Sequence, residues 1–385
     1  MKIVYCINSI SHTGGIERVT IAKANALADI PGNEVWIAYT DVNPAHPEPV
    51  LPVDARVRLS DLNIRYYADD YKGWYYRMKS NLRRRKHRKI LKELLDDIRP
   101  DIVVSTGQCE KYFLPGLCRK HTPAYVREFH YHRYYRKEGA KSLAGRIKAA
   151  LTDFYDFRLQ LPRYDATCVL TQEDFDRNWR HSHIAGKVHV IPNPLTEHTS
   201  ARAHYDAHTA VTVGRIAAQK NHASLVRAWE RVAETHPDWK LAIYGDGELM
   251  EALRTQVAEA GLEESVLLKG RVDEVSERMA ECSIFVLTSR FEGFGLVLAE
   301  AANVGLPMVS YACPCGPRDI ISDGTDGMLV PPEDEESLAR ALKKLMGSEP
   351  LRRRMGEAAL QTARRYDPAA IARQWMELFN KLTNR

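Results

Sequence analysis

The stretch IFVLTSRFEGFGLVLAEA, residues 284–301, is the most informative part of the sequence about the fold. Its apolar start, 284–288, has the length and composition of a buried strand, and a helix is expected from about Leu296. The loop between them holds two glycines, which allow a tight turn from strand to helix. A strand that runs through such a loop into a helix is the repeating unit of a parallel α/β sheet.

Strand and helix signals alternate in the same way along most of the chain. In the first half, strand-like runs lie at 2–8, 34–39, 101–105, 124–129, 166–171 and 188–192, with a helical pattern at 16–29. In the second half they lie at 210–214, 241–245, 266–268, 284–288 and 308–310, with a helix at about 222–235. Two such series predict an α/β protein with two Rossmann-like domains, each built on a parallel sheet.

The polar stretch 193–208 separates the two series and is the natural linker. We therefore expect an N-terminal domain at 1–195 and a C-terminal domain at 196–367. The last segment, 368–385, has apolar residues at helical spacing. It is expected to form a helix that packs back on the N-terminal domain through Trp375, Leu378, Phe379 and Leu382.

Length and composition fit a soluble protein of two domains, with 385 residues of which 44% are hydrophobic and 27% are charged. No stretch approaches the roughly 20 apolar residues that a membrane-spanning helix requires. The N-terminal apolar run, 2–7, is too short for a signal peptide. A cytoplasmic protein is therefore expected.

The seven cysteines are scattered, and Cys313 and Cys315 are the only close pair. A zinc site would need two more ligands at suitable spacing, and none lies nearby. We therefore predict no metal site, and we interpret the cysteines as thiols in a reducing compartment.

The segment 71–92 is both basic and aromatic. Between Lys72 and Lys92 there are ten Lys or Arg and no Asp or Glu, and tryptophan and tyrosine lie among them. Such a segment can lie on an anionic membrane surface or hold an acceptor that carries phosphate. It can equally be the solvated basic face of a helix. Nucleic acid is not predicted, because no recognition motif accompanies the charge.

Two further loops are candidates for phosphate binding. Gly14 and Gly15 lie between the first strand and the first helix, where the N–H groups of a helix N-terminus can approach an anion. Any tight turn can use two glycines, and the full dinucleotide fingerprint is absent. In the second series, Gly214 ends a strand and is followed by Arg215 and Lys220. These cations suit a diphosphate at the carboxyl end of the sheet, or they are ordinary surface charges.

The loop of the opening stretch is the third candidate, because its amides can hold a phosphate at the N-terminus of the helix. Glu292 before the helix and Glu300 just over one turn inside it can accept hydrogen bonds from sugar and ribose hydroxyls. Glutamates near helix starts are also common because of the helix dipole. The helix dipole accounts for Glu292, but it does not account for the whole combination of glycines and glutamates in this loop and helix start. The residues whose amides would hold the phosphate are Gly293, Phe294, Gly295 and Leu296.

His130 is the fourth candidate. It follows the strand-like run 124–129 and would leave the sheet at the carboxyl end of that strand. There it can face a substrate, although a lone histidine can equally be structural.

These motifs together resemble glycosyltransferase family 4, a group of retaining enzymes with the GT-B fold. The string 291–300 is similar to the family's two-glutamate signature, with seven residues between the acids. The segment 214–220 resembles the family's cationic pair, and 14–18 resembles its N-terminal glycine loop. His130 lies where the family carries a histidine. The run 315–321 is similar to bacterial members that build surface polysaccharides and lipopolysaccharides.

The resemblance extends from the first strand to about residue 330, and it implies a fold and a set of roles. In the GT-B fold, two Rossmann-like domains face each other across a cleft, with the first domain on the acceptor side. Glu292 would contact the donor sugar and Glu300 the nucleotide ribose. Arg215 and Lys220 would neutralise the diphosphate, and His130 would touch the donor sugar or the bond being formed. The phosphate cradle would be completed by Gly14, Gly15 and the amides after Phe294.

The implied reaction moves a hexose from a nucleotide diphosphate sugar, by preference a UDP-sugar, to a saccharide or lipid-linked acceptor. No metal is needed, because cations and helix dipoles stabilise the leaving group. Front-face departure of the diphosphate and double displacement through an enzyme nucleophile both remain open. A nucleotide-sugar epimerase and a non-catalytic scaffold are the alternative functions. The expected location is the cytoplasm, with peripheral attachment to the inner face of the cell membrane through 71–92.

Overall fold

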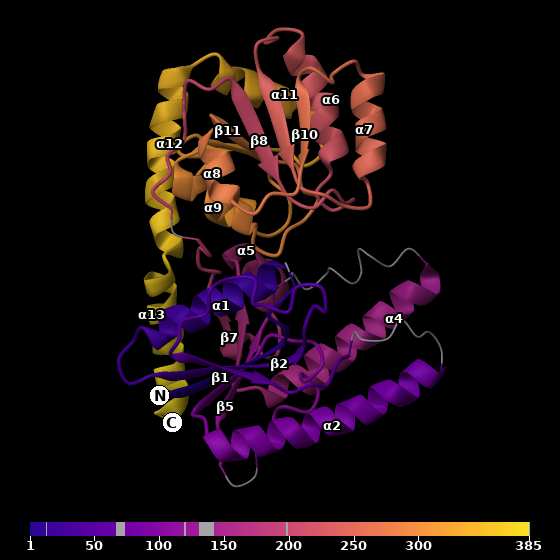
Figure 1. Cartoon of the computed structure of the whole chain (residues 1–385), viewed down its shortest axis with the longest axis vertical. Helices are drawn as coiled ribbons and strands as arrows, with labels where there is room; N and C mark the ends of the chain where they lie inside the picture. Colours follow the sequence, from indigo (N-terminus) through magenta and orange to yellow (C-terminus); the bar gives the residue numbers. More distant parts are fainter. Residues whose placement is uncertain (13, 67–73, 119–120, 131–141, 198, 385) are drawn as a thin grey trace. The chain divides into compact units, whose positions relative to one another are not determined.

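The computed structural model describes the chain except for residues 13, 67–73, 119–120, 131–141, 198 and 385 (Figure 1). It forms two compact units. Unit 1 comprises 1–170, 174–196 and 368–385, and unit 2 comprises 171–173 and 197–367. Each unit is built on one sheet in which all the strand pairs are parallel, which confirms the predicted fold class.

Unit 1 contains a seven-stranded sheet in the order β3-β2-β1-β4-β5-β6-β7. The strands are β1 Lys2–Ser9, β2 Glu34–Asp41, β3 Val57–Asp61, β4 Ile102–Ser105, β5 Ala124–Glu128, β6 Ala166–Val169 and β7 Val188–Val190. The longer helices are α1 Gly15–Ala28, α2 Trp74–Ile98, α4 Leu143–Phe154 and α13 Pro368–Thr383. Short turns of helix are η1 Tyr155–Gln160, η2 Leu161–Arg163, η3 Phe175–Trp179 and η4 Ala185–Lys187. The turn α5 Gln172–Asp174 lies at the boundary, with 172–173 in unit 2.

Unit 2 contains a six-stranded sheet in the order β10-β9-β8-β11-β12-β13. The strands are β8 Thr209–Val213, β9 Lys240–Tyr244, β10 Val266–Gly270, β11 Ile284–Leu287, β12 Met308–Tyr311 and β13 Gly327–Val330. The helices are α6 His222–Ala233, α7 Met250–Glu259, α8 Val275–Ala280, α9 Leu296–Val304, α10 Pro317–Ile320, α11 Glu335–Met346, α12 Glu349–Ala363 and η5 Arg364–Tyr366.

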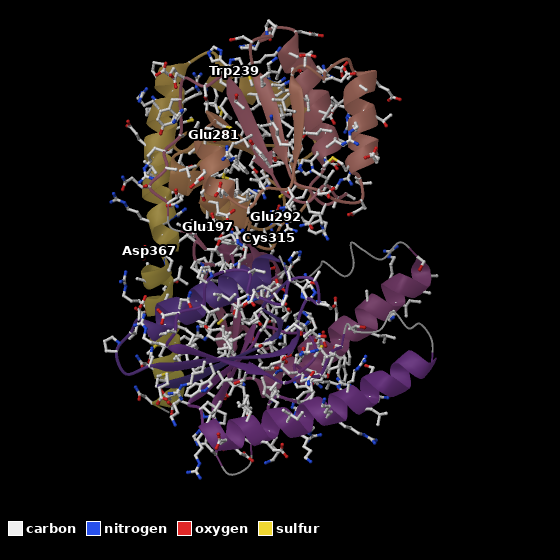
Figure 2. All side chains as sticks on the ribbon, in the orientation of Figure 1. Glu197, Trp239, Glu281, Glu292, Cys315 and Asp367 are labelled. Atoms are coloured by element: carbon white, nitrogen blue, oxygen red, sulfur yellow. The ribbon has the colours of Figure 1, made fainter. Side chains whose placement is uncertain are left out.

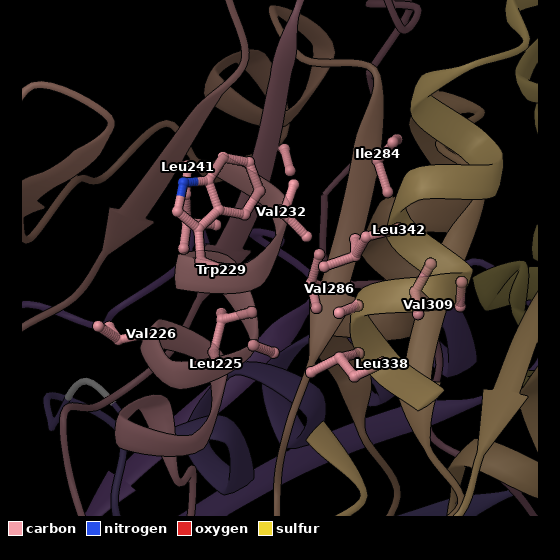
Figure 3. Packing of buried hydrophobic residues seen from close by; sticks show 14 of the residues in the cluster. Leu225, Val226, Trp229, Val232, Leu241, Ile284, Val286, Val309, Leu338 and Leu342 are labelled. Atoms are coloured by element: carbon pink, nitrogen blue, oxygen red, sulfur yellow. The ribbon is translucent and has the colours of Figure 1, made fainter. Parts of the chain in front are cut away.

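The core of unit 2 lies between its sheet and the helices that cover it, and part of it is shown in Figure 3. Trp229 of α6 and Leu342 of α11 are fully buried against Val286 of β11. Because burying a large apolar side chain stabilises a fold by about 1.5–3 kcal/mol, this layer of aliphatic and aromatic groups anchors the strands of the sheet.

The helix α13 completes the core of unit 1, although it follows unit 2 in the chain. Trp375 and Phe379 are fully buried there, with their ring centroids 5.5 Å apart. The apolar spacing of 368–385 thus corresponds to a buried helix face.

Two strands were not predicted. β3 lies at the edge of its sheet, and only Val57 of its five residues is buried, so its sequence lacks a strand-like apolar run. β13 begins with Gly327, where a Cβ atom would lie 2.4 Å from the carbonyl oxygen of Met308. No helix in the described part of the chain is both long and apolar enough to cross a bilayer.

Candidate active site

The loops that carry the predicted donor-binding residues meet at the carboxyl edge of the sheet in unit 2. β8 and β11 are neighbours, and the order of the strands reverses between them. In an open α/β sheet, the crevice outside such a reversal is where ligands bind. The loop 214–221 leaves β8 there, and the loop 288–295 leaves β11, so the fold brings these two distant segments together.

An ion pair joins the two loops. The ammonium group of Lys220 donates to Oε1 of Glu292 at 2.7 Å. The hydroxyl of Ser289 donates to the same oxygen at 2.6 Å. The side chain of Glu292 is only 8% exposed, whereas that of Lys220 is 20% exposed. Lys220 therefore keeps access to a ligand while Glu292 holds it in place.

Gln219 fixes the backbones of the two loops to each other. Its carbonyl accepts the N–H of Arg290 at 2.8 Å, and its side-chain amide donates to the carbonyl of Phe291 at 2.9 Å. The hydroxyl of Thr288 donates to the carbonyl of Lys220 at 3.2 Å. These bonds flank the Lys220–Glu292 pair on both sides, so the backbone sets its geometry.

The helix α9 starts directly after the glycine loop. Gly295 is its N-cap and has φ 83°, a left-handed conformation that only glycine adopts without steric cost. Gly316 permits a second close approach, because a Cβ atom there would lie 2.0 Å from the carbonyl oxygen of Phe294. The ring of Phe294 is buried against Tyr366, with centroids 5.3 Å apart. At Phe294, then, the backbone and not the side chain is offered to a ligand. The two other predicted residues of this loop, Gly293 and Leu296, are half-buried.

The remaining predicted residues of unit 2 lie at the same edge in contrasting surroundings. Glu300 lies inside α9 and is 4% exposed. Arg215 is exposed and forms no ion pair with a described residue. Gly214 packs under Lys220, since a Cβ atom there would lie 3.3 Å from Cε of that side chain. Arg215 is thus available to a bound anion, but the fold does not hold it as it holds Lys220.

Unit 1 also reverses its strand order, between β1 and β4. Gly14 caps α1 with extended backbone, and Gly15 is the first residue of that helix. The side chain of Glu17 lies over this loop, because a Cβ atom on Gly14 would come within 2.2 Å of its Oε2. Burial raises the pKa of Glu17. A phosphate in the predicted cradle would meet this carboxyl group, so the two compete unless Glu17 is protonated or turns away.

His130 follows β5 at the carboxyl edge of the unit 1 sheet, with its side chain 4% exposed. Its Nε2 lies 3.6 Å from Oε1 of Glu128, whose carboxylate also pairs with the buried Lys23. Burial lowers the pKa of His130 to about 4, although Glu128 acts in the opposite direction. The imidazole is therefore neutral near pH 7. Neither ring nitrogen has a hydrogen-bond partner among the described residues.

Comparison with known proteins identifies the family of the chain. A family model described as Glycosyltransferase Family 4 matches residues 13–197, and one described as Glycosyl transferases group 1 matches residues 197–362. The chain belongs to glycosyltransferase family 4. The two matches cover the glycine loop of unit 1 and the paired loops of unit 2.

Relatives in this family include proteins of polysaccharide assembly. An exopolysaccharide phosphotransferase of Streptomyces coelicolor is 38% identical over 231 residues, which is 59% of this chain and 24% of that protein. The amylovoran biosynthesis glycosyltransferase AmsD of Erwinia amylovora is 34% identical over 220 residues, 55% of this chain and 61% of that protein. The chain thus matches less than two thirds of the length of either relative.

A solved structure shares the fold over nearly the whole chain. It is that of a mutant TarM of S. aureus in complex with fondaparinux, α-GlcNAc-glycerol and UDP. It aligns with a TM-score of 0.77 and 15% identity, and covers 98% of this chain and 99% of its own. This likeness supports the GT-B architecture expected of a family 4 glycosyltransferase.

The chain also contains two acidic residues separated by one position, Asp174 and Asp176. Here Asp174 accepts hydrogen bonds from Asn178 at 2.6 Å and from the Trp179 indole at 2.9 Å, and Asp176 pairs with Arg180. These acids therefore have structural partners. No group of potential metal ligands is found among the described residues.

Several residues that build this family 4 site were not singled out from the sequence. Ser289 and Gln219 act through contacts between loops that lie far apart in the chain. Glu173 binds the N–H of Cys315 at 3.1 Å and the guanidinium of Arg318 at 2.9 Å. Ser289 had one usable signal, since it follows a buried strand at the edge where ligands bind. It lies three residues before Glu292, which is labelled in Figure 2. No feature of the sequence indicated a role for Gln219 or Glu173.

Proposed function

We propose that the chain is a retaining hexosyltransferase. It moves a sugar from a nucleotide diphosphate sugar, by preference a UDP-sugar, to a saccharide or lipid-linked acceptor. The reaction belongs to the assembly of surface polysaccharide or lipopolysaccharide. The observation that carries this proposal is the Lys220–Glu292 pair, held at 2.7 Å at the strand reversal of unit 2 beside the N-terminus of α9.

The loop chemistry matches a diphosphate leaving group. Lys220 and the exposed Arg215 offer positive charge, and the start of α9 offers backbone N–H groups to phosphate oxygens. Both hydrogen bonds to Glu292 use Oε1, which leaves Oε2 for a hydroxyl of the donor sugar. Glu300 binds the ribose in this proposal. The UDP preference draws support from the TarM complex, whose crystals contained UDP.

During transfer, the bond between the anomeric carbon and the β-phosphate oxygen breaks while the acceptor oxygen bonds to the same face of that carbon. The acceptor proton passes to a diphosphate oxygen, so the leaving group serves as the base and no enzyme nucleophile is required. Lys220 and Arg215 stabilise the charge that grows on the diphosphate. His130, neutral near pH 7, donates or accepts a hydrogen bond at the donor sugar, which would give a partner to one of the two ring nitrogens that have none among the described residues.

The outcome of a donor assay distinguishes this function from its alternatives. Purified protein is incubated with a panel of nucleotide sugars, and free sugar, nucleotide and sugar isomers are measured. Slow release of nucleoside diphosphate and free sugar is expected, together with thermal stabilisation by the correct donor. Isomerised donor would identify an epimerase. A protein that is neither stabilised by any donor nor able to cleave one would be a scaffold.

Turnover should survive removal of divalent metals. Lys220, Arg215 and the α9 amides supply the charge stabilisation that a metal supplies in other transferases, and Asp174 and Asp176 have structural partners. We expect transfer rates to be the same within about twofold with and without a chelator. A rate that collapses on chelation and returns with magnesium or manganese would show that this assignment is wrong.

The proposed acceptor also sets a location. A lipid-linked acceptor sits at a bilayer, and we propose that the protein works at the inner face of the cell membrane, attached through the basic segment 71–92. Its side chains at 71–79 lie outside the described residues. Beyond them, α2 carries exposed cations at Arg84, Arg85, Lys86, Arg88 and Lys89.

A further inference from the structure

The exposed apolar side chains of the described residues are concentrated on one helical segment. Nine large hydrophobic residues are strongly exposed, and six of them lie between 143 and 159. Leu143 is 74% exposed and Leu151 is 65% exposed. The six residues, which we call the α4 stripe, are Leu143, Ile147, Leu151, Phe154, Tyr155 and Leu159.

The α4 stripe forms one face of a continuous helical run. Its members are three or four residues apart, apart from the adjacent pair Phe154 and Tyr155, and such residues share a helix face. The π-helical turn η1 winds the chain less per residue than an α-helix, which keeps Leu159 near the same face. The opposite, buried face carries Asp153 and Asp156, and Asp156 pairs with Lys111 at 3.0 Å.

This arrangement reverses the usual amphipathic helix of a soluble domain, in which apolar residues face the protein. Here six of the seven large apolar side chains between 143 and 159 point to solvent, with Phe157 as the buried exception. The acids Asp153 and Asp156 point inward and are 7% and 6% exposed. A face of this kind requires an apolar partner, because exposed contiguous apolar surface is otherwise an aggregation hazard.

The charges beside the stripe indicate which partner. Every charged residue exposed between 142 and 160 is a cation, namely Arg146, Lys148 and Arg158. The basic helix α2 adjoins the stripe, since Arg84 lies 5.1 Å from the ring of Tyr112, which contacts the ring of Tyr155 at 5.8 Å. Phe154 and Arg158 also line a cavity of about 430 Å³ to which Arg177 contributes a further cation.

A second copy of the chain fits this surface poorly. In a two-fold dimer the same patch meets itself, so the exposed charges of this segment that come together would all be positive. An anionic bilayer satisfies both features, because the apolar groups enter the boundary of the acyl chains while the cations meet lipid phosphates.

We propose that the α4 stripe inserts into an anionic membrane and that its flanking cations, with those of α2, bind the lipid headgroups. The inference rests on the proposed function for the reason to be at a bilayer, and it assigns the inserting surface to α4 and η1 rather than to 71–92 alone. The basic segment then supplies attraction, and the stripe supplies insertion.

Vesicle flotation tests this proposal. The full-length protein is mixed with vesicles of phosphatidylcholine, or of phosphatidylcholine with phosphatidylglycerol, at low and high salt. The stripe variant is Leu143→Ser/Ile147→Ser/Leu151→Ser. The matched control is Leu59→Ser/Leu249→Ser, at exposed leucines outside the stripe. A third variant changes Arg83, Arg84, Arg85 and Lys86 to Ser.

The unmodified protein and the control should float with anionic vesicles and release at high salt. The stripe variant should bind at least about tenfold more weakly while its thermal midpoint is unchanged. Flotation of the stripe variant equal to that of the control would overturn the proposal, even if the α2 variant lost binding. Absence of flotation of the unmodified protein would overturn it as well.

Two further measurements separate the remaining outcomes. Light scattering that gives a dimer for the unmodified protein and a monomer for the stripe variant would identify the stripe as a self-association surface, against the proposal. Donor cleavage without vesicles should be the same in the stripe variant and the control. If neither protein cleaves or binds a donor but the flotation pattern holds, the proposed function fails while the membrane surface stands.

Discussion

Replacing Lys220 by alanine should lower the turnover of sugar transfer by about 100-fold or more. The ammonium group is fixed at 2.7 Å from Glu292, so it is already in place when charge grows on the departing diphosphate. Removing it also leaves Glu292, with a side chain 8% exposed, without its cation. Arg215→Ala should have an effect of similar size if the exposed guanidinium closes on the diphosphate.

Two controls separate loss of catalysis from loss of folding. Lys220→Met keeps the length of the side chain without its charge and should lower turnover as much as alanine does. Lys240→Ala, at the amino end of β9, removes a lysine from the opposite edge of the same sheet and should leave turnover unchanged. Wild-type turnover in both Lys220→Ala and Arg215→Ala would show that the site has been assigned to the wrong loops.

Glu300→Gln and Glu292→Gln should affect different steps. A hydrogen bond to a charged group contributes about 1.5–3 kcal/mol, so Glu300→Gln should raise the Kd of the nucleoside diphosphate by about tenfold or more. Glu292→Gln should leave that Kd nearly unchanged, because the glutamine oxygen can still accept the hydrogen bond from Lys220. It should lower turnover by about 100-fold, because it weakens the contact to the donor sugar, which the nucleoside diphosphate lacks.

Isothermal calorimetry with the nucleoside diphosphate alone checks this division. Glu259→Gln serves as the control, since it neutralises an exposed acid at the end of α7 in the same unit. An equal loss of nucleotide binding in the Glu292 and Glu300 variants would contradict separate roles for the two carboxylates.

The sequence predicted most of the strands, because the central ones are buried on both faces and read as continuous apolar runs. Helices such as α4, α7 and α11 were not predicted. The edge strand β3 was not predicted, because only one of its five residues is buried and its sequence is not a continuous apolar run. The α4 stripe shows a different limit. Periodicity identifies an amphipathic helix, but it does not say which face the protein covers, and here the face that carries most of the large apolar side chains is the exposed one.

For the candidate site, the sequence predicted the residues that carry charge and left out those that connect loops. Glu292 and Lys220 were named from motifs, and their 2.7 Å contact follows from the adjacency of β8 and β11. Gln219 could not be predicted, because its role depends on the main chain of a loop that is distant in sequence. The position of Glu17 over Gly14 likewise depends on a side-chain conformation.

The return of α13 to unit 1 has a consequence for how the protein is made. Unit 1 needs Trp375 and Phe379 in its core, whereas unit 2 is complete by residue 367. During synthesis, therefore, the later unit can acquire its fold while the earlier one still presents an open apolar face. A released chain that stops at residue 367 would hold a complete second unit and a first unit without Trp375 and Phe379, which is the reverse of the usual order in which domains are completed and fold.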